Sequence, residues 1–137
     1  MYKNYKYLVL FTCFLSVLVV GLGAYTRLSD AGLGCPDWPG CYGFLTVPKH
    51  ETALLHVEQN YPDMMFEAAK AWKEMIHRYF AGALGLFILA LFVFAWLKRQ
   101  YPTTPVKLPL ALLLLVVFQA ALGMWTVTMN LQPLVVM

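Results

Sequence analysis

The chain has 137 residues, of which 61% are hydrophobic and 12% are charged. Ordinary soluble domains carry about 25% charged residues, and the apolar residues here gather in three long blocks, which excludes one large soluble core and indicates membrane spans. The net charge is +3, but no run of basic residues suits nucleic acid, so we expect no nucleic-acid partner.

The placement of the charges predicts the topology. Basic residues precede the first apolar block and lie between the second and third, whereas every acid lies between the first and second. Cytoplasmic segments carry the excess of Lys and Arg. We therefore expect an integral membrane protein with a cytoplasmic N-terminus, an external loop over 26–74 and a cytoplasmic loop over 98–107. The expected location is the bacterial inner membrane. The acids are Asp30, Asp37, Glu51, Glu58, Asp63, Glu67 and Glu74.

Residues 7–25 carry no charge and would form a helix of about 28 Å, which is long enough to cross the hydrocarbon core. Lys3 and Lys6 before this stretch resemble the start of a signal peptide, but its apolar part is longer than usual, so we expect a retained anchor. Arg27 follows directly. It is either an interfacial anchor or a partner for an acidic group on a ligand.

Cys35 and Cys41 enclose five residues in a segment rich in glycine and proline. The spacing does not match a zinc site, and an external compartment is oxidising, so a structural disulfide is the simplest interpretation. A redox-active pair is the alternative, because short strained rings are reduced more easily. Cys13, within the first apolar block, is expected to be a small core residue.

His50 and His56 are six residues apart, which does not place them on one helical face, so we expect solvated loop histidines. Asp63 after Pro62 is typical of a helix N-cap. Nothing breaks the pattern strongly from there to Leu97. The sequence therefore predicts one long helix with a wet first portion and a membrane span over 75–97.

Glu74, His77 and Arg78 lie at the mouth of that span. Ionisable groups are costly in a bilayer and usually have a function there. Glu74 and His77 share one helical face, an arrangement that suits a haem ligand with a nearby acid or base. The alternative is that they merely reach for water. Gly82 and Gly85 next to this face would admit another helix or a flat ligand.

Residues 108–129 form the predicted third span, in which Gln119 either bonds another helix or faces a bound cofactor. Residues 130–137 look like an external turn toward a fourth span that is absent. We therefore expect a fragment or truncated gene product. No other histidine lies in a span, so a second ligand would come from missing sequence or a second chain.

Four stretches together resemble the N-terminal half of the haem A synthases, the membrane enzymes that convert haem O into haem A. They are Tyr25–Leu33, Cys35–Cys41 with its Cys-Pro-Asp-Trp-Pro sequence, Glu74–Arg78 with Glu-x-x-His-Arg, and Gln119–Val127. The resemblance covers nearly the whole chain.

The resemblance implies an all-α polytopic membrane helical bundle with eight spans in two four-helix halves. Residues 1–137 would be a single transmembrane domain with three spans of one half. His77 would be an axial ligand of haem iron, Glu74 an essential catalytic carboxylate, and Cys35–Cys41 a disulfide. The remaining cofactor-binding candidates are Arg78, Arg27 and Gln119, and haem b is expected in the missing half.

The reaction implied is oxidation of a haem O methyl group to the formyl group of haem A, with an unknown electron acceptor. Haem O synthase, a second copy of the chain and membrane lipid are the other expected partners. A non-catalytic haem-binding or haem-delivery protein would also need His77 but not Glu74. A thiol–disulfide oxidoreductase would use Cys35 and Cys41, although such enzymes usually need a second cysteine pair.

Overall fold

The computed structural model describes residues 2–101 and 104–129, and within these ranges it contains four helices and no regular strand. They are α1 (Tyr2–Leu28), α2 (Glu51–Asn60), α3 (Ala68–Leu97) and α4 (Lys107–Thr128). Helices α1, α3 and α4 are long and apolar enough to cross a membrane. The predicted all-α fold with three membrane helices is confirmed. The turn predicted over 130–137 lies outside the described residues.

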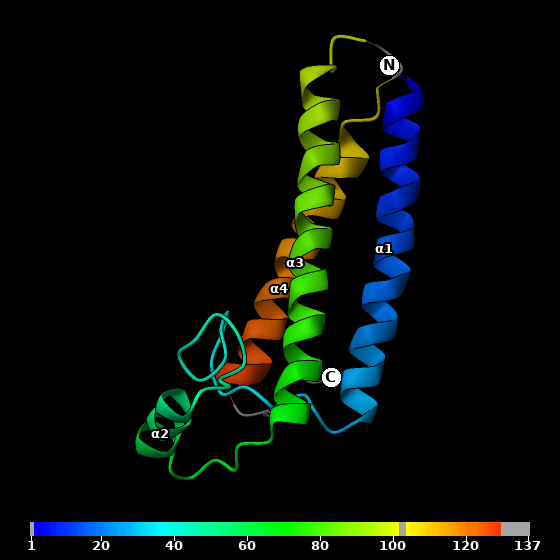
Figure 1. Ribbon diagram of the computed structural model, residues 1–137. Coiled ribbons are helices and arrows are strands. Elements are labelled where there is room, and N and C mark those ends of the chain that lie inside the picture. Colours follow the sequence, from blue (N-terminus) through cyan, green and yellow to red (C-terminus); the bar gives the residue numbers. More distant parts are fainter. Residues whose placement is uncertain (1, 102–103, 130–137) are drawn as a thin grey trace.

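Helix α3 lies at the centre of the molecule. It packs against both α1 and α4, which do not pack on each other in the described ranges, and Figure 1 shows α4 crossing behind α3. The start of α1 meets the end of α3, where the rings of Tyr5 and Phe94 stack with centroids 5.0 Å apart. A Cβ on Gly85 would lie 3.7 Å from Val116 of α4, so Gly85 serves helix packing.

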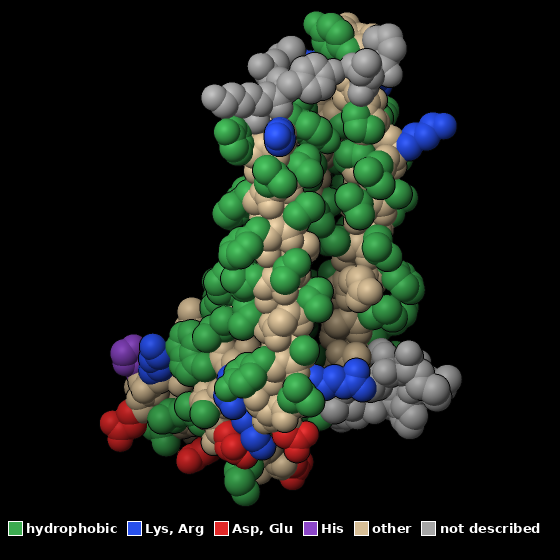
Figure 2. All heavy atoms as spheres, turned by 90° about the vertical axis from the view of Figure 1, so that its right-hand side faces the viewer, with side chains coloured by type: hydrophobic (Ala, Val, Ile, Leu, Met, Phe, Trp, Pro, Cys, Tyr) green, Lys and Arg blue, Asp and Glu red, His purple; other side chains and the backbone are tan. Residues whose placement is uncertain are grey.

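The outer sides of the three long helices stay exposed although they are apolar. Val17, Leu86 and Leu114 are examples, one from each helix. Figure 2 shows hydrophobic side chains along the sides of the helices and acidic side chains gathered at one end. A surface this apolar is stable in lipid and not in water. The chain is therefore an integral membrane protein.

The start of α3 differs from the prediction. The helix begins at Ala68, and Glu67 before it is extended, with φ −119° and ψ 101°, so Asp63 is not its N-cap. The residues between α2 and α3 instead form a turn that directs Phe66 toward Tyr42, with the two rings 5.3 Å apart. Packing of this aromatic pair outweighs the local preference for helix.

Helix α2 was not predicted. His50 precedes it and His56 lies inside it, and both histidines are exposed. The prediction of a loop position is therefore wrong for His56, while its solvated side chain is as expected. Only Val57 of this helix is buried, so the sequence shows no apolar repeat that would reveal it.

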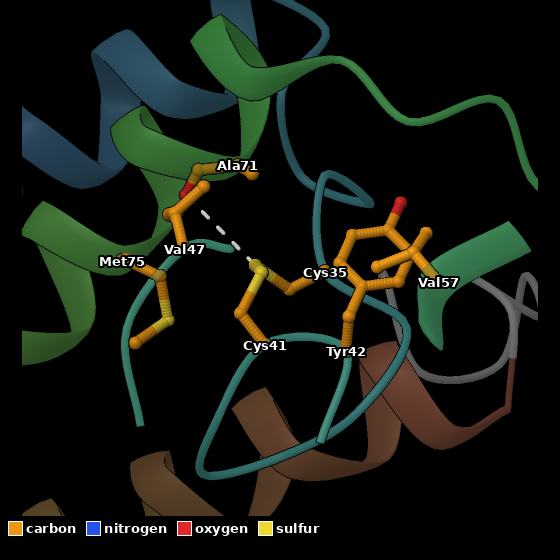
Figure 3. Close-up of a cluster of buried hydrophobic side chains, with 7 residues drawn as sticks. All are labelled: Cys35, Cys41, Tyr42, Val47, Val57, Ala71 and Met75. Atoms are coloured by element: carbon orange, nitrogen blue, oxygen red, sulfur yellow. Dashed lines mark hydrogen bonds between the residues drawn. A yellow bond between two sulfur atoms is a disulfide. The ribbon is translucent and has the colours of Figure 1, made fainter. Parts of the chain in front are cut away.

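The segment between α1 and α3 has a small core of its own, drawn in Figure 3. Loop residues, α2 and the first turns of α3 all contribute to it. This packed layer sits at one end of the membrane helices and fixes the surroundings of the first turns of α3. Its buried members are Cys35, Cys41, Tyr42, Val47, Val57, Ala71 and Met75.

Candidate functional site

A buried ion pair near the start of α3 joins this helix to the preceding segment. Glu74 is only 5% exposed, and Arg78, one turn later, donates through Nη2 to its Oε1. The backbone N–H of Cys35 donates to the other oxygen, Oε2, at 3.0 Å. Both carboxylate oxygens thus have partners, as a buried charge requires.

The other terminal nitrogen of the Arg78 guanidinium, Nη1, binds backbone carbonyls. Nη1 donates to the carbonyl oxygens of Asp37, at 2.8 Å, and Gly40, with that of Pro39 farther away at 3.4 Å. The rigid fork of arginine suits such a multiple contact. In the structure these donors hold the chain on both sides of Trp38, and the predicted role of Arg78 in cofactor binding stays a prediction.

The Asp37 carboxylate stabilises a tight turn in the same loop. It accepts hydrogen bonds from the N–H groups of Tyr42 at 2.6 Å and Gly43 at 2.8 Å. These two residues have positive φ, 54° and 82°, and Cys41 and Phe44 on either side pair through both backbone groups. This is the pattern of a type I′ turn. Burial raises the pKa of Tyr42 above its usual value, and the nearby Asp37 charge raises it further.

A disulfide joins Cys35 to Cys41 under this turn. Both cysteines are 0% exposed. Gly34 lies directly on the backbone of α3, because a Cβ there would approach the carbonyl carbon of Lys70 to 2.6 Å and the nitrogen of Ala71 to 2.7 Å. Only glycine permits this approach. This segment, residues 34–45, is called the disulfide loop below, and its backbone lies directly on the backbone of α3.

The His77 side chain is half-buried and faces α1 instead of the loop. A Cβ on Gly23 of α1 would lie 3.0 Å from Nε2 of the imidazole. The Thr26 hydroxyl lies 3.5 Å from the Lys73 carbonyl oxygen, also across the α1–α3 contact. Glu74 thus contacts the loop, whereas His77 contacts α1. No hydrogen bond connects the two side chains in the described part of the chain.

The other two predicted site residues lie apart from this group. Arg27 is exposed in the last turn of α1, and Gln119 is exposed on α4. Among the described residues, neither makes a hydrogen bond or an ion pair with Glu74, His77 or Arg78. Their roles in cofactor binding stay predictions.

Sequence reasoning missed Asp37, Gly34 and Gly23. Asp37 was noted as one of the acids and in the Cys-Pro-Asp-Trp-Pro sequence, but not as the support of a turn, because Tyr-Gly is not one of the usual type I′ pairs. Gly34 is required by its close approach to the backbone of α3, and Gly23 lies close to His77 across the α1–α3 contact. No local pattern marks such positions.

The fold and the site define a polytopic helical membrane protein whose central span begins with a buried Glu–Arg pair, holds a disulfide loop against itself and carries a histidine toward the neighbouring span. The chain belongs to the COX15-CtaA family of cytochrome oxidase assembly proteins, which it matches over residues 6–137.

Curated relatives are named heme A synthase. The protein of Shewanella oneidensis is 56% identical over 131 residues, which cover 96% of this chain and 39% of the relative. Those of Wolbachia pipientis and Mesorhizobium japonicum are 32% and 29% identical, covering 89% and 94% of this chain and 40% and 38% of the relatives. The chain thus spans about two fifths of their length. No solved structure matches the chain.

Proposed function

We propose that the chain acts in haem A biosynthesis as part of a haem A synthase, a membrane oxidoreductase that oxidises a methyl group of haem O to the formyl group of haem A. The observation that carries the proposal is the 56% identity to a protein named heme A synthase, over nearly the whole chain. The Glu-x-x-His-Arg start of α3 supports it, because it places one histidine inside a membrane span.

The residues present fit a haem, whose iron His77 would hold. His77 offers an imidazole within a span, and the absence of a Cβ at Gly23 leaves the space that its ring requires. When bound, haem supplies the redox chemistry, and electrons pass to an acceptor. Of the three histidines in the sequence, only His77 lies in a long apolar helix, so a second histidine for the haem would come from a further segment or a second copy.

Replacing His77 with Ala is expected to remove the haem held by this half and so lower the total bound haem, whereas replacing His56 should not, because His56 is exposed on α2. Reduced-minus-oxidised spectra of purified full-length protein measure the bound haem. Normal spectra in His77→Ala, with loss in His56→Ala, would refute the ligand assignment.

Glu74 is proposed to carry protons during oxidation of the haem edge, since it lies one turn from His77 near the wet end of the span. In the structure both of its oxygens accept hydrogen bonds, so proton uptake would have to release one of them. Glu74→Gln should stop haem A production while haem stays bound. The assay compares haem O and haem A in membranes that express wild type or variant.

A second candidate is a non-catalytic haem-binding or haem-delivery protein. The engagement of Glu74 by Arg78 and Cys35 favours it, because these contacts give the carboxylate a structural task. Normal haem A production in Glu74→Gln would eliminate the catalytic role of Glu74, and loss of bound haem would make Glu74 a support of the site. Thiol–disulfide exchange is disfavoured, since Cys35 and Cys41 are fully buried and Cys13 is the remaining cysteine.

A further inference from the structure

The disulfide loop reaches far along α3. The Tyr79 hydroxyl donates to the Leu45 carbonyl oxygen at 2.8 Å, and Tyr79 lies well inside the helix that begins at Ala68. Figure 1 shows the loop rising beside the lower turns of α3 instead of ending beyond them. From Tyr79 to Leu97 the helix measures roughly 27 Å, slightly less than the hydrocarbon thickness of a bilayer. If the hydrocarbon ends at Leu97, its other edge lies at the level of Tyr79 and Leu45.

Pairs of basic and aromatic side chains at both ends of α3 give an independent measure. Arg99 lies over the ring of Trp96, 4.4 Å from its centroid, and Lys73 lies over the ring of Tyr25 at 5.2 Å. Such side chains favour the headgroup level. Lys73 and Trp96 are separated by roughly 35 Å of helix, as two headgroup layers require, and Tyr79 lies roughly 9 Å inside Lys73.

The loop exposes large apolar side chains at this level. Leu45 is 81% exposed and Trp38 is 43% exposed. Tyr79 and Phe80 on the adjoining turn of α3 are exposed as well, so the apolar surface continues from the loop onto a membrane span. Apolar groups of this size gain stability only where water is excluded.

Side chains satisfy several backbone groups of the loop. Arg78 binds the carbonyls of Asp37 and Gly40, the Asp37 carboxylate binds the N–H groups of Tyr42 and Gly43, and Tyr79 binds the carbonyl of Leu45. Irregular backbone persists near lipid only where protein groups replace the hydrogen bonds of water.

We propose that residues 37–45 form a lipid-facing shelf that lies where hydrocarbon meets headgroups. Leu45 and Trp38 contact lipid there, and Arg78 holds the shelf against α3. The bilayer is the partner because this surface is continuous with the exposed apolar side of α3. The proposal is independent of haem chemistry.

The test places a nitroxide label on the cysteine of a Leu45→Cys variant of the full chain that also carries Cys13→Ser. The protein is reconstituted in vesicles of phosphatidylethanolamine and phosphatidylglycerol. Collision with oxygen reports lipid, and collision with a water-soluble nickel chelate reports water. The matched controls are Glu58→Cys on exposed α2 and Leu86→Cys on the exposed side of α3. The label at 45 is expected to resemble the label at 86, with oxygen accessibility dominating, whereas the label at 58 meets the nickel chelate.

Access of the nickel chelate to position 45 at the level seen at position 58 would overturn the proposal, because the loop would then lie in water. Protection of position 45 from both reagents would overturn it as well, since protein would then cover the surface. Arg78→Gln is expected to move the label at 45 toward water while the label at 86 stays in lipid. An unchanged label at 45 in Arg78→Gln would refute the part assigned to Arg78.

Discussion

Gly21 and Gly23 near the end of α1 meet different surroundings although one residue separates them. A Cβ on Gly23 would lie 3.0 Å from His77 Nε2, whereas a Cβ on Gly21 would meet nothing within 4 Å. A contact of 3.0 Å is shorter than an ordinary van der Waals contact between carbon and nitrogen. The imidazole would therefore have to shift by a few tenths of an ångström. The pair therefore offers a matched test of the position of His77.

We expect Gly21→Ala to stabilise α1 by up to about 1 kcal/mol, because alanine loses less backbone entropy in a helix than glycine. Gly23→Ala should lack this gain and should alter the haem spectrum, because its methyl group displaces the proposed ligand. Thermal unfolding and absorption spectra of the two full-length variants measure both effects. Identical spectra in both variants would show that His77 does not depend on this space.

The cluster of Glu74, His77 and Arg78 could be predicted from the sequence, but its partners could not. A charged group within a span is visible in any sequence. The partners of Arg78, in contrast, are backbone carbonyls of residues 37–40, and every residue has a carbonyl. The positive φ of Tyr42 could not be predicted either, because bulky residues rarely adopt this conformation.

At the scale of elements, the three long helices follow from their apolar runs, because bilayer thickness fixes the length of a span. The segment between α1 and α3 follows different rules. Its helix α2 buries one residue, and its connection to α3 is set by the contact of Phe66 with Tyr42. These features depend on packing between residues that are distant in sequence, so local helix propensity cannot predict them.

Asp37→Ala is expected to loosen the disulfide loop by about 2 kcal/mol, because two backbone N–H groups lose a charged acceptor. Since Cys35 and Cys41 are 0% exposed, a reductant reaches the disulfide only when the loop opens. The rate of reduction by a membrane-impermeant phosphine should therefore rise about 30-fold.

Asp63→Ala is the control for this experiment, because Asp63 is an exposed acid of the same segment. The reduction rate is measured by labelling the thiols that the reductant releases. Both variants carry Cys13→Ser, so that only the thiols of Cys35 and Cys41 are labelled. Equal reduction rates in Asp37→Ala and Asp63→Ala would contradict the bracing of the turn by Asp37.

At the scale of the whole molecule, α3 alone connects the other two long helices in the described ranges. The acids gather at the end that carries the disulfide loop, as Figure 2 shows for one face. The basic residues Lys98 and Arg99 lie at the opposite end of α3. This polarity is the basis of the predicted orientation, with the loop external.

Cysteines introduced at Glu58 and Gln100 test that orientation in a Cys13→Ser background. An impermeant maleimide added to spheroplasts should label position 58 and should label position 100 only after lysis. The reverse pattern would place the disulfide loop on the cytoplasmic side.

The Arg78 contact also orders events during biosynthesis. The carbonyl groups that receive this guanidinium belong to residues 37–40, which leave the ribosome well before α3 does. In the predicted orientation the loop would be translocated while the helix that later covers Cys35 through Ala71 and Glu74 is still being made. The thiols would then be open to the oxidative machinery of the external compartment, and the arrival of α3 would close a loop that is already cross-linked.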